Sequence, residues 1–181
     1  TQTNKPTPRT RTGTISPSTP PKEPGGSPMI IRPIEERDNA AVREIISDSL
    51  ESHGLAIPGS AYFDPQLGEL TQFYDSLPHA CYWVVEVDGS VVGGVGIAPF
   101  GTDATTICEL QKLYLRPEVQ GRGLSRLLMD QALAFAARHY KQCYLETTHS
   151  LRTACILYEK YGFRLLPEPL PGSPVAWIFL R

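Results

Sequence analysis

The spacing of apolar residues after Met29 predicts regular elements separated by an irregular loop. The short apolar run 29–32 predicts a strand, and residues 35–51 carry their apolar side chains on one helical face. Glycine and proline within 53–63 predict an irregular loop there, which is a candidate substrate lid. A second, shorter helix is expected over 67–74.

The middle of the chain predicts an antiparallel meander. Runs rich in strand-forming residues cover 81–87 and 91–98, and Asp88-Gly89 between them is a strong signal for a two-residue hairpin. A third run, 107–115, follows after a polar turn. Three consecutive strands are therefore expected side by side.

The second half of the chain alternates between helices and strands. Apolar residues recur at helical spacing over 123–139 without a proline, and 151–161 predicts a further helix. Strands are expected at 142–146, 163–166 and 175–180. Strand–helix–strand units join parallel strands, so at least one parallel crossover is expected. The predicted fold class is α/β, with a mixed sheet of about seven strands flanked by helices.

Residues 1–28 differ in composition from the rest of the chain. They contain seven prolines and seven threonines, with Ile15 as the only aliphatic residue. Such a segment cannot bury enough apolar surface to offset the entropy of ordering. A disordered tail, native or added, is therefore predicted ahead of one domain at 29–181.

Charge and hydropathy narrow the possible partners. The chain has 17 basic and 19 acidic residues, without a basic stripe that would follow a nucleic-acid backbone. No apolar run approaches the roughly 18–20 residues of a membrane helix, and no signal peptide is recognisable. We expect a cytoplasmic protein with neither a nucleic-acid nor a membrane partner, and monomer and homodimer both remain open.

The four cysteines give no pattern of a metal site. Cys81, Cys108, Cys143 and Cys155 lie far apart in the sequence, whereas zinc ligands come in short pairs. We expect buried thiols in a reducing compartment and no metal.

The most informative segment joins the strand 107–115 to the helix at 123–139. Gly121 and Gly123 form a turn at the start of this helix, where unpaired N–H groups and the helix dipole attract an anion. Arg122 and Arg126 add positive charge. A simple tight turn is the alternative interpretation.

Two other phosphate-binding motifs fit this segment poorly. A P-loop would place Gly-Lys-Ser/Thr before the helix, and that sequence is absent. A dinucleotide fingerprint would need a third glycine where Arg126 stands, and its first glycine would directly follow the strand. Glu146 lies near the acidic position of such a fold, but that coincidence alone does not support nicotinamide binding.

Two motifs resemble the GNAT superfamily of N-acetyltransferases. Gln120-x-x-Gly123-x-Ser125 is similar to the family's pyrophosphate loop, Gln/Arg-x-x-Gly-x-Gly/Ala, with serine as the last small residue. Residues 154–163, Ala-Cys-Ile-Leu-Tyr-Glu-Lys-Tyr-Gly-Phe, resemble its Ala-x-x-Leu-Tyr-x-Lys-x-Gly-Phe segment. Leu151 stands where the family often has asparagine. The resemblance covers 29–181 in element order.

The resemblance implies acetyl-coenzyme A (acetyl-CoA) as cosubstrate. Backbone groups of Leu113 and Leu115 would pair with the pantetheine amides, and a backbone N–H near Leu113 would meet the oxyanion. The implied binding residues are Leu113, Tyr114, Leu115, Gln120, Gly121, Arg122, Gly123, Leu124, Ser125 and Arg126.

Acetyl transfer to an amine needs a proton acceptor, because such amines are mostly protonated at neutral pH. Glu109, in the strand that leads into the phosphate loop, is the first candidate by placement and resemblance. Glu146 is the second and His149 the third. A glutamate paired with Lys112 is the structural alternative for Glu109.

Tyr158 is the candidate proton donor. Its helical spacing with Leu151, Ala154 and Cys155 favours a tyrosine packed in the core. The family's tyrosine at this position donates a proton to the coenzyme A thiolate, so the resemblance implies a catalytic role.

The acceptor is expected to be a primary amine of a small molecule or amino acid, with a peptide amine as the alternative. The irregular segments 53–63, 100–106 and 169–174 would wall its pocket. A different class of function is a non-catalytic acyl-CoA sensor. The presence of Glu109 and Tyr158 favours an enzyme.

Overall fold

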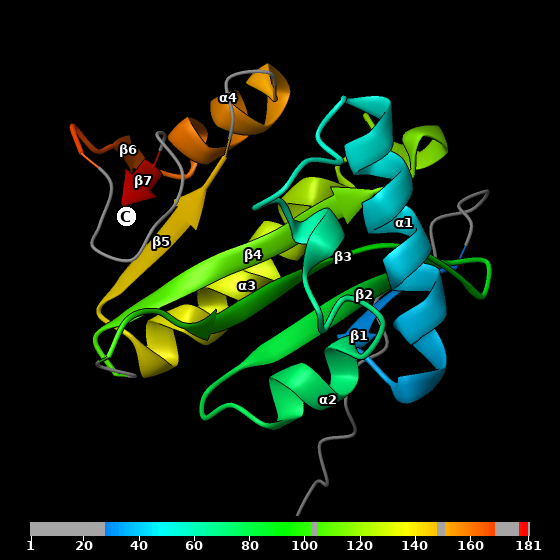
Figure 1. The fold of residues 1–181 in the computed structure, drawn as a ribbon, viewed down its shortest axis with the longest axis horizontal. Coiled ribbons are helices and arrows are strands. Elements are labelled where there is room, and N and C mark those ends of the chain that lie inside the picture. The colour runs from blue at the N-terminus through cyan, green and yellow to red at the C-terminus, as the bar shows by residue number, and fades with distance from the viewer. Residues whose placement is uncertain (1–27, 103–104, 148–150, 169–177, 181) are drawn as a thin grey trace, which may run out of the picture.

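A seven-stranded mixed sheet in the order β1-β2-β3-β4-β5-β7-β6 forms the centre of the protein, with helices on both faces (Figure 1). The computed structural model describes residues 28–102, 105–147, 151–168 and 178–180. The strands are β1 (Met29–Pro33), β2 (Cys81–Val87), β3 (Ser90–Pro99), β4 (Ile107–Leu115), β5 (Gln142–Glu146), β6 (Arg164–Leu165) and β7 (Ile178–Leu180). The predicted fold class is confirmed.

In the described ranges, four α-helices and three short 3-10 turns connect the strands. The helices are α1 (Asn39–Ser52), α2 (Leu70–Asp75), α3 (Leu124–His139) and α4 (Arg152–Lys160). The turns are η1 (Glu36–Asp38), η2 (Ala61–Phe63) and η3 (Pro117–Val119).

The predicted meander and crossover are both present. Strands β1 to β4 pair antiparallel in sequence order, and β4 pairs parallel with β5 through the crossover helix α3. At the β2–β3 hairpin, Asp88 has a φ of 51° and Gly89 a φ of 77°. Positive φ at both turn residues matches the twist of the flanking strands.

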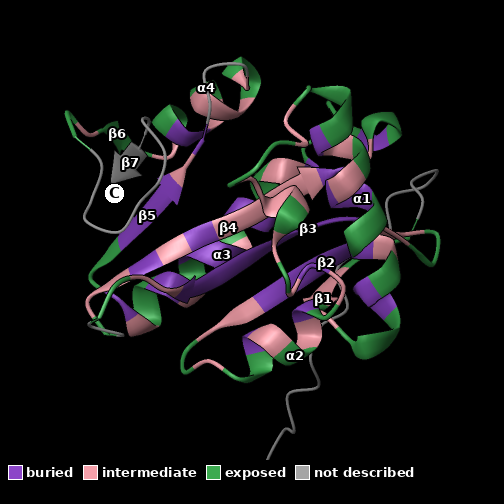
Figure 2. Cartoon of the chain, in the orientation of Figure 1, coloured by how far each residue is buried: buried purple, intermediate pink, exposed green. Residues whose placement is uncertain are grey.

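Two apolar cores lie on opposite faces of the sheet. On one face α3 contributes Leu128 and Met129 to a cluster with Val95 and Leu110. On the other, α1 and α2 pack on Tyr82, Val84 and Ala98 through residues that include Ile46 and Leu70. Buried residues accordingly concentrate on the sheet and the inner sides of its helices (Figure 2).

Several element boundaries differ from the sequence-based expectation. The helix predicted over 35–51 begins as the turn η1, and α1 starts only at Asn39. The loop 53–63 contains η2, and the helix expected at 67–74 is limited to α2. The predicted strand 163–166 is reduced to β6, while residues 175–177 and most of the tail 1–28 lie outside the described residues.

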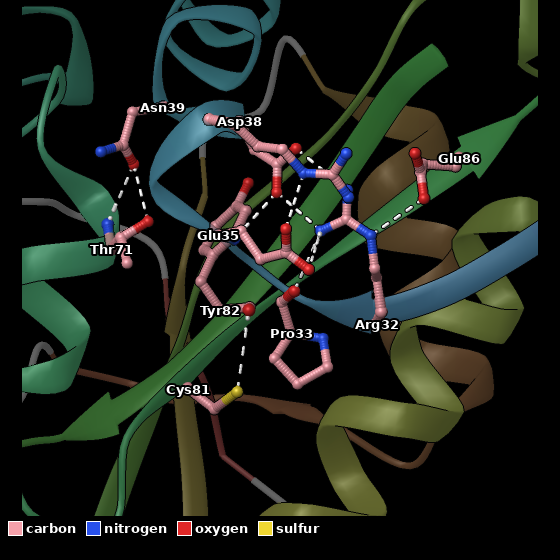
Figure 3. A network of polar contacts seen from close by, with 10 residues as sticks. Arg32, Pro33, Glu35, Asp38, Asn39, Thr71, Cys81, Tyr82 and Glu86 are labelled. Atoms are coloured by element: carbon pink, nitrogen blue, oxygen red, sulfur yellow. Dashed lines mark hydrogen bonds and ion pairs between the residues drawn. The ribbon is translucent and has the colours of Figure 1, made fainter. Parts of the chain in front are cut away.

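A polar network surrounds the turn η1 at the start of α1 (Figure 3). The Asp38 carboxylate accepts hydrogen bonds from Arg32 Nη1 at 2.7 Å and Nη2 at 3.0 Å, and also from the Glu35 N–H. Arg32 Nε donates to Glu86 on β2 at 2.9 Å. The bond from the Glu35 N–H is part of a capping box that begins η1, and the bonds of Arg32 join β1 to β2 and to the start of α1.

Asn39 fastens the two helices of this face to each other. Its Oδ1 accepts hydrogen bonds from the Thr71 N–H at 3.1 Å and the Thr71 hydroxyl at 2.9 Å (Figure 3). An otherwise open N–H at the start of α2 is thereby satisfied by α1. The layer formed by α1 and α2 is thus held by specific polar contacts as well as by its apolar core.

All four cysteines are free thiols. Cys108 and Cys143 are buried as expected, whereas Cys81 and Cys155 are only partly buried. Across the described segments, no group of His, Cys, Asp and Glu is arranged to hold a metal ion. None of the described helices is both long and apolar enough to cross a membrane.

Candidate active site

Strands β4 and β5 part from each other shortly after they meet (Figure 1). Their pairing runs from Ile107 opposite Gln142 to Glu109 opposite Tyr144 and ends there. Among the described residues, the rest of this edge of β4, at 110–115, has no neighbouring strand. Its N–H and C=O groups can therefore pair with an extended ligand, as predicted for Leu113 and Leu115.

A bulge interrupts β4 at the same place. Gly94 pairs with Tyr114 and Gly96 with Gln111, so two residues of β4 face one residue of β3. Lys112 has a φ of 52° at this point, and its carbonyl oxygen accepts a hydrogen bond from the Tyr82 hydroxyl at 2.9 Å. The extra residue changes which side chains face each layer.

The bulge gathers polar side chains on the face covered by α1 and α2. The apolar residues Leu110 and Leu115 belong to the α3 core. On the opposite face, Gln111 accepts a hydrogen bond from Tyr74 of α2, and Tyr114 packs against the α1–α2 core. Lys112 extends to Asp64, which follows η2. One side of β4 is therefore apolar, and the other side bears the polar and ionisable side chains.

Glu109 lies in this polar row and is held by a hydrogen-bonded relay. The Tyr74 hydroxyl donates to Gln111 Oε1 at 2.8 Å, and Gln111 Nε2 donates to Glu109 Oε2 at 2.8 Å. Burial raises the pKa of Glu109, and the nearby Glu146 charge adds to this, while the Gln111 hydrogen bond and the Lys112 charge oppose it. A carboxyl of raised pKa is suited to take up a proton.

The second candidate base lies beside the first. Tyr144 is the β5 residue opposite Glu109, and its hydroxyl donates to Glu146 Oε1 at 3.1 Å. Glu146 is two residues beyond Tyr144 and therefore on the same face of the strand. The fold thus brings together both carboxylates, whereas His149 lies outside the described residues.

A glycine allows the relay to sit directly on the sheet. A Cβ atom at Gly96 would collide with the Tyr74 hydroxyl. Sequence reasoning missed Tyr74 and Gln111 as part of the site. The available signal was glycine at 93, 94 and 96 within an apolar strand, which marks close approach of other groups to the backbone.

The phosphate-loop candidate forms the turn that was predicted. Gly121 and Gly123 have φ values of 77° and 78°, and Gly123 caps α3 without any side-chain hydrogen bond. Nothing lies within 4 Å of a Cβ built at either glycine, so the positive φ is what requires glycine here. The first N–H groups of a helix lack intrahelical partners, and residues 121–123 are exposed, so an anion can approach this turn.

The remaining residues of the predicted loop have different roles. Arg122 and Arg126 are exposed at the turn and can add positive charge. Gln120 Nε2 donates to the Leu115 carbonyl at 3.3 Å and so closes the loop on the end of β4. Leu124 is buried in the core, and only its backbone can meet a ligand.

Tyr158 approaches from the opposite layer. It is 7% exposed, belongs to the α3 core and packs on Phe163 with a ring-centroid distance of 6.0 Å. Burial raises the pKa of its hydroxyl far above the usual range, and Tyr114 and Cys155 reinforce the shift. The hydroxyl therefore carries its proton at neutral pH. Tyr158 and Glu109 lie in the two layers that flank the opening between β4 and β5.

Three kinds of comparison identify related proteins. A protein-family model described as "Acetyltransferase (GNAT) domain" matches residues 78–165. The N-acetyltransferase YjgM of Escherichia coli K12 is 44% identical over 136 residues, which cover 74% of this chain and 81% of that protein. Human N-acetylaspartate synthetase is 34% identical over 115 residues, which cover 61% of this chain and 37% of the synthetase.

Solved structures have the same fold. A GNAT-family acetyltransferase from Staphylococcus aureus Mu50 matches with a TM-score of 0.72 at 17% identity, covering 85% of this chain and 98% of that one. PaiA N-acetyltransferase from Thermoplasma acidophilum, solved with coenzyme A, matches with a TM-score of 0.64 at 18% identity over the same shares.

These relatives confirm the predicted family and, with it, an enzyme of the N-acetyltransferase class. The open edge of β4 and the glycine turn at α3 are the two features that a long ligand with a phosphate group would need. The chain belongs to the GNAT superfamily of N-acetyltransferases.

Proposed function

We propose that this protein transfers the acetyl group of acetyl-CoA to the primary amine of a small molecule or amino acid. One observation carries the proposal. Where β4 and β5 part, a partly buried carboxyl of raised pKa, Glu109, lies in one layer, and a buried protonated hydroxyl, Tyr158, lies in the other. A base and an acid on two sides of one opening are what acyl transfer to an amine requires.

The cosubstrate would lie along β4 and supply an activated thioester carbonyl. Leu113 and Leu115 would bind its amides through their backbone groups, and the turn at 121–126 would bind its pyrophosphate. A backbone N–H near Leu113 would stabilise the negative charge that develops on the carbonyl oxygen.

Proton removal from the acceptor is assigned to Glu109. An amine of lysine type has a pKa near ~10.4, so it arrives as an ammonium ion and must lose a proton before its nitrogen can attack. Glu109 accepts this proton directly or through water, and the Gln111 amide holds its carboxylate in place. Glu146 lies on the same face and is the alternative acceptor.

Tyr158 is assigned the second proton transfer. As the C–N bond forms and the C–S bond breaks, its hydroxyl gives a proton to the departing sulfur and is later reprotonated from solvent. Thiols have a pKa near ~8.5. A tyrosine whose pKa is raised by burial keeps its proton at neutral pH, so its O–H can be presented to the sulfur as negative charge develops there.

An amino-acid acceptor is preferred to a peptide. Several relatives of about one third identity are named N-acetylaspartate synthetase, and that name describes acetylation of a free amino acid. The chain spans less than two fifths of these synthetases, so the support concerns the class of acceptor only.

The test is release of free thiol from acetyl-CoA in the presence of a panel of amines, with mass spectrometry of the acetylated product. We expect thiol and product in equal amounts with at least one small amine, and strong loss of both in Glu109→Gln. Glu69→Gln, which changes an exposed glutamate, is the matched control. Coenzyme A binding without thiol release for any acceptor would instead indicate a sensor.

A further inference from the structure

Lys112 carries a buried ammonium group that has no role in the proton transfers of the proposed reaction. Its side chain is 8% exposed, and Nζ lies 2.8 Å from Asp64 Oδ2. Its backbone has a φ of 52°, in the left-handed region that a residue with a side chain seldom adopts. Proteins keep such strain where the surroundings impose it, and these places are concentrated at functional sites.

The bulge places Lys112 in the layer of Glu109. Without the extra residue, the alternation of β4 would direct position 112 toward the α3 core, where a charge would be costly. With the extra residue, Lys112 reaches Asp64 in the same layer as Glu109. The positive charge is near enough to Glu109 to lower the pKa of that carboxyl. Bulges beside active sites commonly re-aim a side chain in this way.

Asp64 differs from Lys112 in its access to solvent. Its side chain is 32% exposed, and it ends the loop 53–64, most of which the sequence predicted to be a substrate lid. An ammonium group has three N–H donors, and Asp64 accounts for one contact. A second carboxylate can therefore bind beside Asp64 or take its place when the loop moves.

We propose that Lys112 binds the carboxylate of the acceptor, which makes the acceptor an amino acid rather than a simple amine. The inference rests on the proposed function. Negative groups at Glu109 and Glu146 meet the acceptor's ammonium, and the positive group at Lys112 meets its carboxylate. The polar row along β4 is in this way complementary to a zwitterion.

The experiment compares an amino acid with its own carboxamide as acceptor, because the pair differs only in the negative charge. The parent enzyme is assayed with the diacid L-aspartate and with its α-amide and β-amide. We expect kcat/KM to be at least tenfold higher for the diacid than for the poorer of the two amides. Equal values for the diacid and both amides would overturn the proposal without any variant being needed.

Lys112→Met tests the residue itself. We expect its kcat/KM for the acid to fall at least tenfold further than its value for the amide, mainly through KM. Lys112→Arg should restore part of the preference, and Lys141→Met, an exposed lysine, is the matched control. Equal losses for acid and amide would show that the ion pair only holds the loop.

Asp64→Asn should change KM for the acid in the opposite direction to Lys112→Met, and it leaves Lys112 itself in place. Without the competing carboxylate, Lys112 should bind the acceptor more tightly, and KM for the acid should fall severalfold relative to the amide. A rise in KM for both acceptors would contradict the proposal. Failure of the proposed function is distinguishable, because then neither acid nor amide would be acetylated.

Discussion

Two carboxyl groups of the protein have opposite pKa shifts: Asp38, which is buried, and Glu109, which is partly buried. Burial opposes ionisation of Asp38, but two hydrogen bonds from Arg32 and one from the Glu35 N–H outweigh it, and the pKa of Asp38 is lowered. Within the part of the chain that the structure describes, Glu109 has the Gln111 amide as its one hydrogen-bond partner and Lys112 as a more distant charge, and its pKa is raised. A fully paired carboxylate holds a structure together, whereas a sparsely paired one can exchange protons.

The two carboxyls also differ in the sheet that surrounds them. Asp38 lies against β1 and β2, which pair over five residues of β1. Glu109 lies at the last of three residue pairs between β4 and β5, where the sheet opens. Continuous pairing leaves no room for a ligand between the strands, and the proposed base lies where pairing stops.

The largest expected effect is on turnover, and it distinguishes Glu109 from Asp38. Glu109→Gln should lower turnover at pH 7 by about 100-fold, because a proton acceptor is lost. The folded pKa of Glu109 is raised, so its contribution to stability is greatest at low pH and is lost as the pH rises through that pKa. Stability of the variant at pH 7, measured by denaturant unfolding, should equal or exceed that of the parent; a clear decrease would contradict this account.

Asp38→Asn should produce the reverse pattern. Removing one partner of the bidentate pair leaves Arg32 uncompensated on that side, and we expect a loss of about 3 kcal/mol in the free energy of unfolding. The folded pKa of Asp38 is lowered, so its stabilisation is present above the ordinary carboxyl pKa and disappears as the pH falls through the lowered value. Turnover of the folded variant should match the parent, which kinetic assays can check.

A substitution in the glycine turn tests where the cosubstrate binds. In Gly123→Val the left-handed φ is strained and a side chain stands at the open N–H groups, so coenzyme A affinity should fall about tenfold or more. Gly89→Val has the same backbone strain at the distant hairpin, where φ is 77°, and serves as the control for folding. Calorimetry showing unchanged affinity in folded Gly123→Val would place the pyrophosphate elsewhere.

Tyr158→Phe should give the smallest of these effects. The ring remains in the core while the proton donor is lost, so turnover should fall about tenfold with little change in coenzyme A affinity. An unchanged turnover number, with chemistry shown to limit the rate, would leave Tyr158 as a core residue only.

The sequence predicted much of this fold because its main signals are local. Asp88-Gly89 specifies a hairpin through its own backbone preferences, and Gly123 marks the start of α3 in the same way. The ends of β2, β4 and β5 agree with the expected ranges 81–87, 107–115 and 142–146. The exact start of α1 was not predicted, because the 3-10 turn η1 precedes it and apolar periodicity does not distinguish a 3-10 turn from an α-helix.

The site was predicted in outline but not in its connections. Glu109, Glu146 and the glycine turn could be chosen from motif and strand position. The bulge at Lys112 could not, because the sequence there gives no break in its strand pattern. The Asp64–Lys112 ion pair joins residues 48 positions apart, and it depends on how the loop 53–64 packs on β4.

The pH dependence of kcat/KM tests the central claim that Glu109 is the proton acceptor most directly. For the parent we expect the rate to fall on the acid side with an apparent pKa above the ordinary ~4.3 of a glutamate, as the raised pKa requires. In Glu109→Gln that acid limb should disappear, and part of the rate should return as the pH rises and free amine becomes available. A variant as fast as the parent from about pH 6 to 9, or loss of the limb in Glu146→Gln instead, would contradict the assignment.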